Sequence, residues 1–193
     1  MFATIISSLG GAFINKFIDG ALAAFTAYNN KQISMEELKT KLLGIMVNAR
    51  GERFVDEGAD FRNYTYAKYG AEILKQPGAI AFQLFDAVTE PMLRHQDYSA
   101  PGMTRYDADT IQGLADLMGV PADALATTVG EYNAAVQPGE FNPAVRDGKG
   151  TRGVTPPKSN WALPLDTPPF VAFPVTCGIT FTYGGIRVDA QAR

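Results

Sequence analysis

The chain has one cysteine and one histidine among its 193 residues. The single cysteine, Cys177, excludes an intrachain disulfide and zinc sites built from several thiolates. With His95 as the only histidine, the chain cannot build both a Ser-His-Asp site and a histidine-based metal site, and the common metal-ligand spacings are absent. The sequence therefore predicts no metal centre.

Long hydrophobic runs and an excess of positive charge are also missing. The uncharged runs 1–15 and 20–30 are each shorter than the roughly 20 residues that span a bilayer as a helix. A basic n-region and a small-residue cleavage site are absent, so we expect a cytoplasmic protein. The net charge of −3 argues against a nucleic-acid partner held by phosphate neutralisation.

Residues 1–43 differ in composition from the rest of the chain, since they contain long uncharged runs. They predict an N-terminal helical arm. Their early apolar residues fit one face of a helix, and Ser34 with Glu37 forms a capping-box pattern that opens a short helix through Leu43. This arm is either an amphipathic pair that packs on the domain or on a second copy, or a membrane-surface helix. Its polar face lacks the lysine and arginine richness of interfacial helices, which favours packing.

The segment 44–70 carries the strongest concentration of charge beside predicted strands. An apolar strand, Ile45–Val47, leads into the turn 48–51, and a second strand is expected at Arg53–Val55. Asn and Gly in such a turn tolerate positive φ, which is typical of a hairpin. The acidic and basic residues that follow are Asp56, Glu57, Asp60 and Arg62. They indicate either part of a charged-substrate site or ordinary surface chemistry.

The remaining segments predict an α+β fold with a small antiparallel sheet and a helix pair. Helices are expected at Tyr64–Leu74, from Asp109 or Thr110 to Gly119, and after Pro121. Strands are expected at Ile80–Phe85 and 170–188, and residues 86–101 are expected to be irregular with a short helix at most. Residues 137–169 form a loop of a length that is usually functional or flexible.

Four motifs occur in an order that resembles a known family. They are GIMVN-x-x-GERFVDE, FDA, the helix pair beginning ADTIQGLADLMGVP, and the terminal PPFVAFPVTCGITFTYGGIRVDA. Over about residues 44–193 the chain resembles the substrate-covering cap region of the succinate dehydrogenase/fumarate reductase flavoproteins. The segments FRNYTYAKYG and PKSNW are most similar to those of tricarballylate dehydrogenase-like members.

The resemblance implies FAD-dependent hydride transfer at a carbon–carbon bond beside the carboxylates of a di- or tricarboxylate. It makes Arg62 the catalytic proton-transfer residue. Because an arginine has a pKa above about 12, neighbouring carboxylates would have to relay protons, and Glu57 and Asp60 are the local candidates. The alternative for Arg62 is a surface salt bridge worth about 0–1 kcal/mol.

The resemblance also assigns roles near the C-terminal end. Thr180 and Thr182 are implied substrate-binding residues, and Gly184 and Gly185 are implied cofactor-binding residues that let the backbone approach closely. Thr180 stands where fumarate reductases have a histidine that binds a substrate carboxylate. This departure favours a related acid over plain succinate or fumarate.

The sequence lacks the G-x-G-x-x-G turn that cradles the FAD pyrophosphate in this family. The division expected is an arm (1–43), a cap domain (44–175) and a strand leading back toward a flavin domain (176–193). On this basis we expect the chain alone neither to bind FAD nor to turn over substrate. A flavin-binding chain can complement it, or the cap can be a remnant in a non-enzymatic, membrane-associated or oligomerising protein.

Overall fold

The computed structural model describes residues 43–93, 95–178, 189 and 191. Four strands of these residues form one antiparallel sheet in the order β1-β2-β4-β3. The strands are β1 (Ile45–Asn48), β2 (Ile80–Phe85), β3 (Tyr106–Ala108) and β4 (Phe170–Thr176). The helices are α4 (Arg62–Leu74), α5 (His95–Tyr98), α6 (Ile111–Met118) and α7 (Ala122–Ala135), with 3₁₀ turns η1 (Pro77–Ala79) and η2 (Glu90–Met92).

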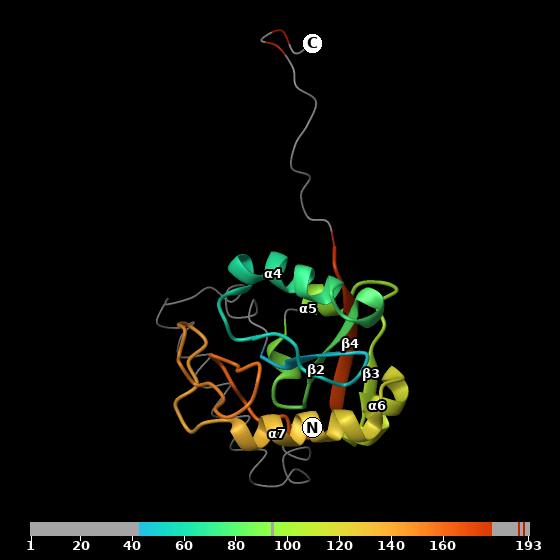
Figure 1. Cartoon of the computed structure of the whole chain (residues 1–193), viewed down its shortest axis with the longest axis vertical. Coiled ribbons are helices and arrows are strands. Elements are labelled where there is room, and N and C mark those ends of the chain that lie inside the picture. Colours follow the sequence, from blue (N-terminus) through green and yellow to red (C-terminus); the bar gives the residue numbers. More distant parts are fainter. Residues whose placement is uncertain (1–42, 94, 179–188, 190, 192–193) are drawn as a thin grey trace, which may run out of the picture.

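The sheet is covered on both faces, because successive side chains along a strand point to opposite sides. In β1, Ile45 and Val47 pack into the core that lies against α6 and α7, whereas Met46 packs against Tyr69 and Ile73 of α4. Figure 1 shows α4 and α7 on opposite sides of the strands. The predicted α+β fold with a small antiparallel sheet and a helix pair is therefore confirmed.

The helix pair has the termini that the sequence predicts. The Thr110 hydroxyl accepts a hydrogen bond from the Gly113 amide at 3.0 Å, which caps α6, and Gly119 closes the helix with a φ of 69°. Helix α7 begins directly after Pro121. It buries Leu125, Val129 and Tyr132 on the stripe that faces the sheet.

The predicted hairpin is wrong in its second strand. Residues Arg53–Val55 form only an isolated bridge between Val47 and Arg53, and β1 pairs instead with β2, where Ile45 lies opposite Leu84. The turn itself forms, because the Asn48 side chain accepts the amides of Arg50 and Glu52 and Gly51 takes a φ of 78°. After this bridge the ladder ends, and the Arg53 side chain is buried, as described below.

The sheet also contains a strand that the sequence pattern did not predict. β3 pairs along the edge of β4, with Tyr106 opposite Ala172 and Ala108 opposite Phe170. Its three residues have no alternation strong enough to mark a strand, so its position depends on β4 rather than on local propensity.

The other expected elements agree closely with the structure. Helix α4 begins at Arg62 rather than Tyr64, β2 has the predicted bounds, and the loop 137–169 carries no helix or strand. The arm expected at 1–43 lies outside the described residues except for Leu43, as does the part of the expected C-terminal strand at 179–188. Among the described residues, no helix is both long and apolar enough to cross a membrane.

Candidate functional site

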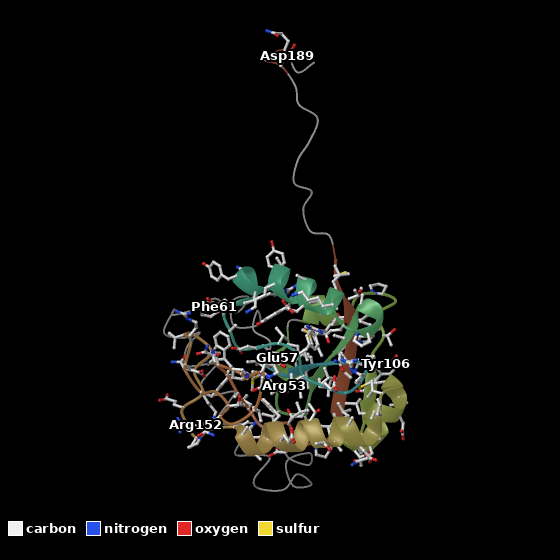
Figure 2. The ribbon with its side chains drawn as sticks, viewed as in Figure 1. Arg53, Glu57, Phe61, Tyr106, Arg152 and Asp189 are labelled. Carbon is white, nitrogen blue, oxygen red and sulfur yellow. The ribbon has the colours of Figure 1, made fainter. Side chains whose placement is uncertain are left out.

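An arginine–glutamate pair lies buried at the centre of the candidate site. Arg53 donates from Nε to Glu57 Oε1 at 3.0 Å and from NH2 to Oε2 at 2.6 Å, and the two side chains are 5% and 0% exposed. Glu57 Oε1 also accepts the amide of Met46 at 2.8 Å, which ties the loop back onto β1. Figure 2 shows both residues in the middle of the body, between α4 and α7.

The Arg53 guanidinium is also bonded to the long loop and stacked on a helix. It donates from NH1 to the Pro156 carbonyl at 2.8 Å and lies 5.2 Å from the centroid of the Tyr132 ring. Burial alone would lower the pKa of Arg53, but the hydrogen bonds and charge of Glu57 outweigh burial and raise it. Arg53 therefore stays charged and joins β1, α7 and the long loop.

A buried lysine from the long loop reaches the start of β1. Lys158 is fully buried, and its Nζ donates to the backbone carbonyls of Leu43, at 2.8 Å, and Gly44. Burial lowers the pKa of Lys158 to about 8, although the nearby charge of Glu57 acts in the opposite direction. The motif PKSNW thus carries a cation into the same interior as the Arg53–Glu57 pair.

The rest of this motif packs on the loop that precedes α4. Asn160 donates to the Gly58 carbonyl at 2.8 Å, and the Ser159 amide and hydroxyl both bond the carboxylate of Asp56. Trp161 is fully buried, with its ring centroid 5.3 Å from that of Phe61. A Cβ at Gly58 would lie 2.3 Å from the Asn160 carbonyl oxygen, so the two segments touch where only glycine fits.

Arg62 stands at the first residue of α4, directly after this fixed loop. Its NH1 donates to Asp97 Oδ2 of α5, and the two side chains are 50% and 25% exposed. The start of α4 has no side-chain cap and no acidic residue in its first turn. A cation there opposes the helix dipole, so local helix stability does not explain why Arg62 occupies this position.

Both elements that carry this ion pair are anchored in the core. In α4, Tyr69 is buried and its hydroxyl donates to the Asp56 carbonyl at 2.9 Å. In α5, the Tyr98 hydroxyl donates to Gln83 of β2 at 2.7 Å, and its ring lies edge-on to that of Phe173 at 4.8 Å. Burial raises the pKa of Tyr98. The meeting point of Arg62 and Asp97 is therefore fixed from both sides.

The structure separates residues that the sequence grouped together. Glu57 faces Arg53 rather than Arg62, and Asp60 accepts its neighbour's amide and lies 3.6 Å from Arg146. The expected pairing of Arg62 with Glu57 or Asp60 is thus replaced by the pairing with Asp97. The catalytic roles of Arg62 and Glu57 stay predictions. Thr180, Thr182, Gly184 and Gly185 lie outside the described residues.

Asp97 and Lys158 are site residues that the sequence analysis did not single out. Asp97 follows the only histidine in a polar stretch and has no periodic signal. Lys158 belongs to the quoted PKSNW motif, and a lysine between two prolines and a serine reads as exposed loop rather than interior. Asp97 bonds Arg62 across 35 residues of sequence, and Lys158 bonds Leu43 across 115. Local sequence patterns cannot show contacts at such separations.

The described residues do not form a cradle for a metal or for a dinucleotide. No group of three or more His, Cys, Asp or Glu side chains among them can hold a metal ion. β3 leads into α6 through Asp109 and Thr110 without a glycine-rich turn, and α4 starts after Phe61 with no glycine beside it. Neither of these two helix starts therefore has the glycine-rich turn that holds phosphates at a helix N-terminus.

Comparison with known proteins shows the family of the chain. A family model described as "FAD binding domain" matches residues 25–193. The probable fumarate reductase Ifc3 of Shewanella frigidimarina is 30% identical over 183 residues, which are 91% of this chain and 27% of that protein. The open conformation of a flavocytochrome c3 fumarate reductase superposes with a TM-score of 0.59 at 28% identity, covering 83% of this chain and 26% of that one.

A 3-ketosteroid delta1-dehydrogenase from Sterolibacterium denitrificans also superposes, with a TM-score of 0.51 at 25% identity over 81% of this chain and 31% of that one. The chain thus spans between about a quarter and a third of the length of these relatives. The match begins at residue 25, before the limit of 44 that the motifs indicated, and none of these relatives is a tricarballylate dehydrogenase. The chain belongs to the FAD binding domain family, in the group that includes the fumarate reductase flavoproteins.

Proposed function

We propose that the chain is the substrate-covering part of an FAD-dependent oxidoreductase that acts on a di- or tricarboxylate. Arg62 is the residue that exchanges a proton with the substrate carbon. The observation that carries this proposal is a half-exposed guanidinium, placed against the helix dipole at the end of a loop that is tied down by buried contacts. Positions held this firmly are what a reacting group requires.

The chemistry of Arg62 suits carboxylates. A guanidinium presents several N–H donors in a planar fork that matches a carboxylate bidentately. Within the described residues, Asp97 is the one side chain that Arg62 contacts, and it engages only NH1. We infer that a ligand carboxylate binds this fork, in competition with Asp97.

Proton transfer from an arginine needs a strongly basic acceptor and a nearby carboxylate, because the guanidinium pKa lies above about 12. The carbanion that forms beside a substrate carboxylate meets the first need. Asp97 meets the second, since its carboxylate touches Arg62. Arg53, Glu57 and Lys158 act as positioning residues that hold the loop on which Arg62 stands.

FAD, when bound, supplies the hydride acceptor or donor of this reaction class. Because the described residues offer no dinucleotide cradle, we expect its phosphates to be held by polypeptide outside them. A flavin-binding chain that this one covers is one source. As the finer assignment we propose a tricarboxylate such as tricarballylate, supported by the motifs FRNYTYAKYG and PKSNW and by Thr180 in place of a histidine.

The test is a comparison of Arg62→Gln with Arg105→Gln in the full chain, co-expressed with a flavin-binding domain of the fumarate reductase group. Arg105 is the matched control, because it is also partly exposed and paired with an aspartate, Asp107. Tricarballylate and succinate oxidation are followed by flavin reduction. We expect Arg62→Gln to lower turnover by about 10²-fold or more and Arg105→Gln to leave it unchanged. Equal turnover in the two variants would refute the assignment of Arg62.

A further inference from the structure

We propose that Asp97 is an internal occupant of the substrate site: its carboxylate holds the Arg62 guanidinium until a ligand carboxylate displaces it. The inference rests on the proposed function in taking Arg62 as a substrate-facing residue. It adds a competition between a side chain of this protein and its substrate. The ligand class is a small carboxylate, because the group already seated on Arg62 is one.

The first argument is geometric. Asp97 comes from α5 and Arg62 from α4, and 35 residues separate them in the chain. Tyr98, the neighbour of Asp97, is fixed by its bond to Gln83 and by its contact with Phe173. Asp97 therefore presents a carboxylate to the guanidinium from a fixed position, as a bound acid would.

The second argument compares the two arginine–carboxylate pairs at the ends of one loop. Arg53 and Glu57 are 5% and 0% exposed, and their bidentate contact is completed by the Met46 amide and the Pro156 carbonyl. Separating such a buried pair leaves an uncompensated charge and is costly. Arg62 and Asp97 are 50% and 25% exposed, so water can take the place of either partner. The Arg53–Glu57 pair therefore stays formed, whereas the Arg62–Asp97 pair can exchange its partner for water or a ligand.

The third argument concerns the cost of displacement. An exposed ion pair of this kind contributes about 0.2–1 kcal/mol, so removing the Asp97 charge changes ligand affinity by at most about fivefold. That amount allows exchange at ordinary substrate concentrations. It also keeps the cationic start of α4 compensated when no ligand is present.

The experiment is a titration of the full chain with tricarballylate, measured by isothermal titration calorimetry, which reads out binding in every variant. Asp97→Asn removes the internal carboxylate with little change in shape. Asp107→Asn is the matched control, since it removes the same charge from the Arg105 pair. We expect Asp97→Asn to bind the tricarboxylate about two- to fivefold more tightly than wild type, and Asp107→Asn to match wild type. Arg62→Gln should abolish binding in both the wild-type and the Asp97→Asn backgrounds.

A purely structural role of Asp97 predicts the opposite sign, because loosening Arg62 would weaken binding. Affinity in Asp97→Asn that is equal to or lower than wild type, or no binding by either protein, overturns the proposal. Asp97→Ser replaces Asp97→Asn if that variant does not fold. The titration uses no flavin, so its failure leaves the turnover test of Arg62 standing, and the reverse also holds.

Discussion

Replacing Lys158 by methionine gives a test in which the sign of a pH effect is fixed by the structure. Burial lowers the pKa of the folded Lys158 to about 8 from its ordinary value of 10.5. Between these two values the unfolded chain keeps the proton and the folded chain has lost it. Unfolding free energy therefore rises with pH across this window, because the unfolded state binds more protons.

The size of the effect follows from the same shift. One pKa unit corresponds to about 1.4 kcal/mol, so raising the pH from about 8 to about 9.5 should add roughly 2 kcal/mol to the stability of wild type relative to Lys158→Met. The charges around Lys158 are Glu57, Arg53, Asp56 and Asp147. Burial raises the pKa of Tyr69 and Tyr132 in both proteins, so their contributions cancel in the difference.

The assay is urea unfolding followed by the fluorescence of Trp161, the only tryptophan, which is fully buried beside the Lys158 loop. Lys75→Met is the control, because Lys75 is 65% exposed and pairs with Glu72 at the end of α4. We expect the unfolding free energy of wild type minus that of Lys158→Met to rise with pH. The same difference for Lys75→Met should stay constant. A difference for Lys158→Met that does not change between about pH 7 and 9.5 would refute the reasoning.

Two other substitutions test the packing of the loop on β1. Glu57→Gln leaves the buried Arg53 guanidinium without its counter-charge. We expect it to lower the free energy of unfolding, measured in urea, by about 3–5 kcal/mol. A loss under about 1 kcal/mol would contradict the description of a buried ion pair. Gly58→Ala places a methyl group 2.3 Å from the Asn160 carbonyl oxygen and should destabilise by several times the few tenths typical of a surface change. Gly130→Ala, in α7 with open space around it, should instead stabilise by about 0.5–1 kcal/mol, and equal effects of the two glycine changes would argue against the close contact.

The sequence predicted those parts of the fold whose signals are local. Thr110, Gly119 and Pro121 mark the ends of α6 and α7 by capping chemistry, and the run Ile80–Phe85 is apolar enough to mark a central strand. The second hairpin strand was predicted wrongly because no local pattern shows that the side chains of Arg53 and Glu57 are buried. Their burial depends on Pro156 and Tyr132, which lie far along the chain.

The candidate site was predictable only in part for the same reason. Arg62 could be singled out from the order of the motifs. Its partner, Asp97, is set by where α5 packs on β2 and β4, and no periodicity in the sequence carries that information. Lys158 was missed because a lysine in a proline-rich loop is normally solvated, and here backbone carbonyls from the start of β1 replace the water.

The long separation of these contacts has a consequence for how the chain reaches its native state. The bond from Arg53 to Pro156 spans 103 residues, the one from Ser159 to Asp56 spans 103, and the one from Lys158 to Leu43 spans 115. Contacts this distant in sequence form late, since a long loop must close before they contribute. During synthesis the segment that carries Arg62 therefore leaves the ribosome well before the residues that shape it. The proposed site is completed only when the last third of the described chain has emerged, so its assembly is a late event rather than a property of the N-terminal segment itself.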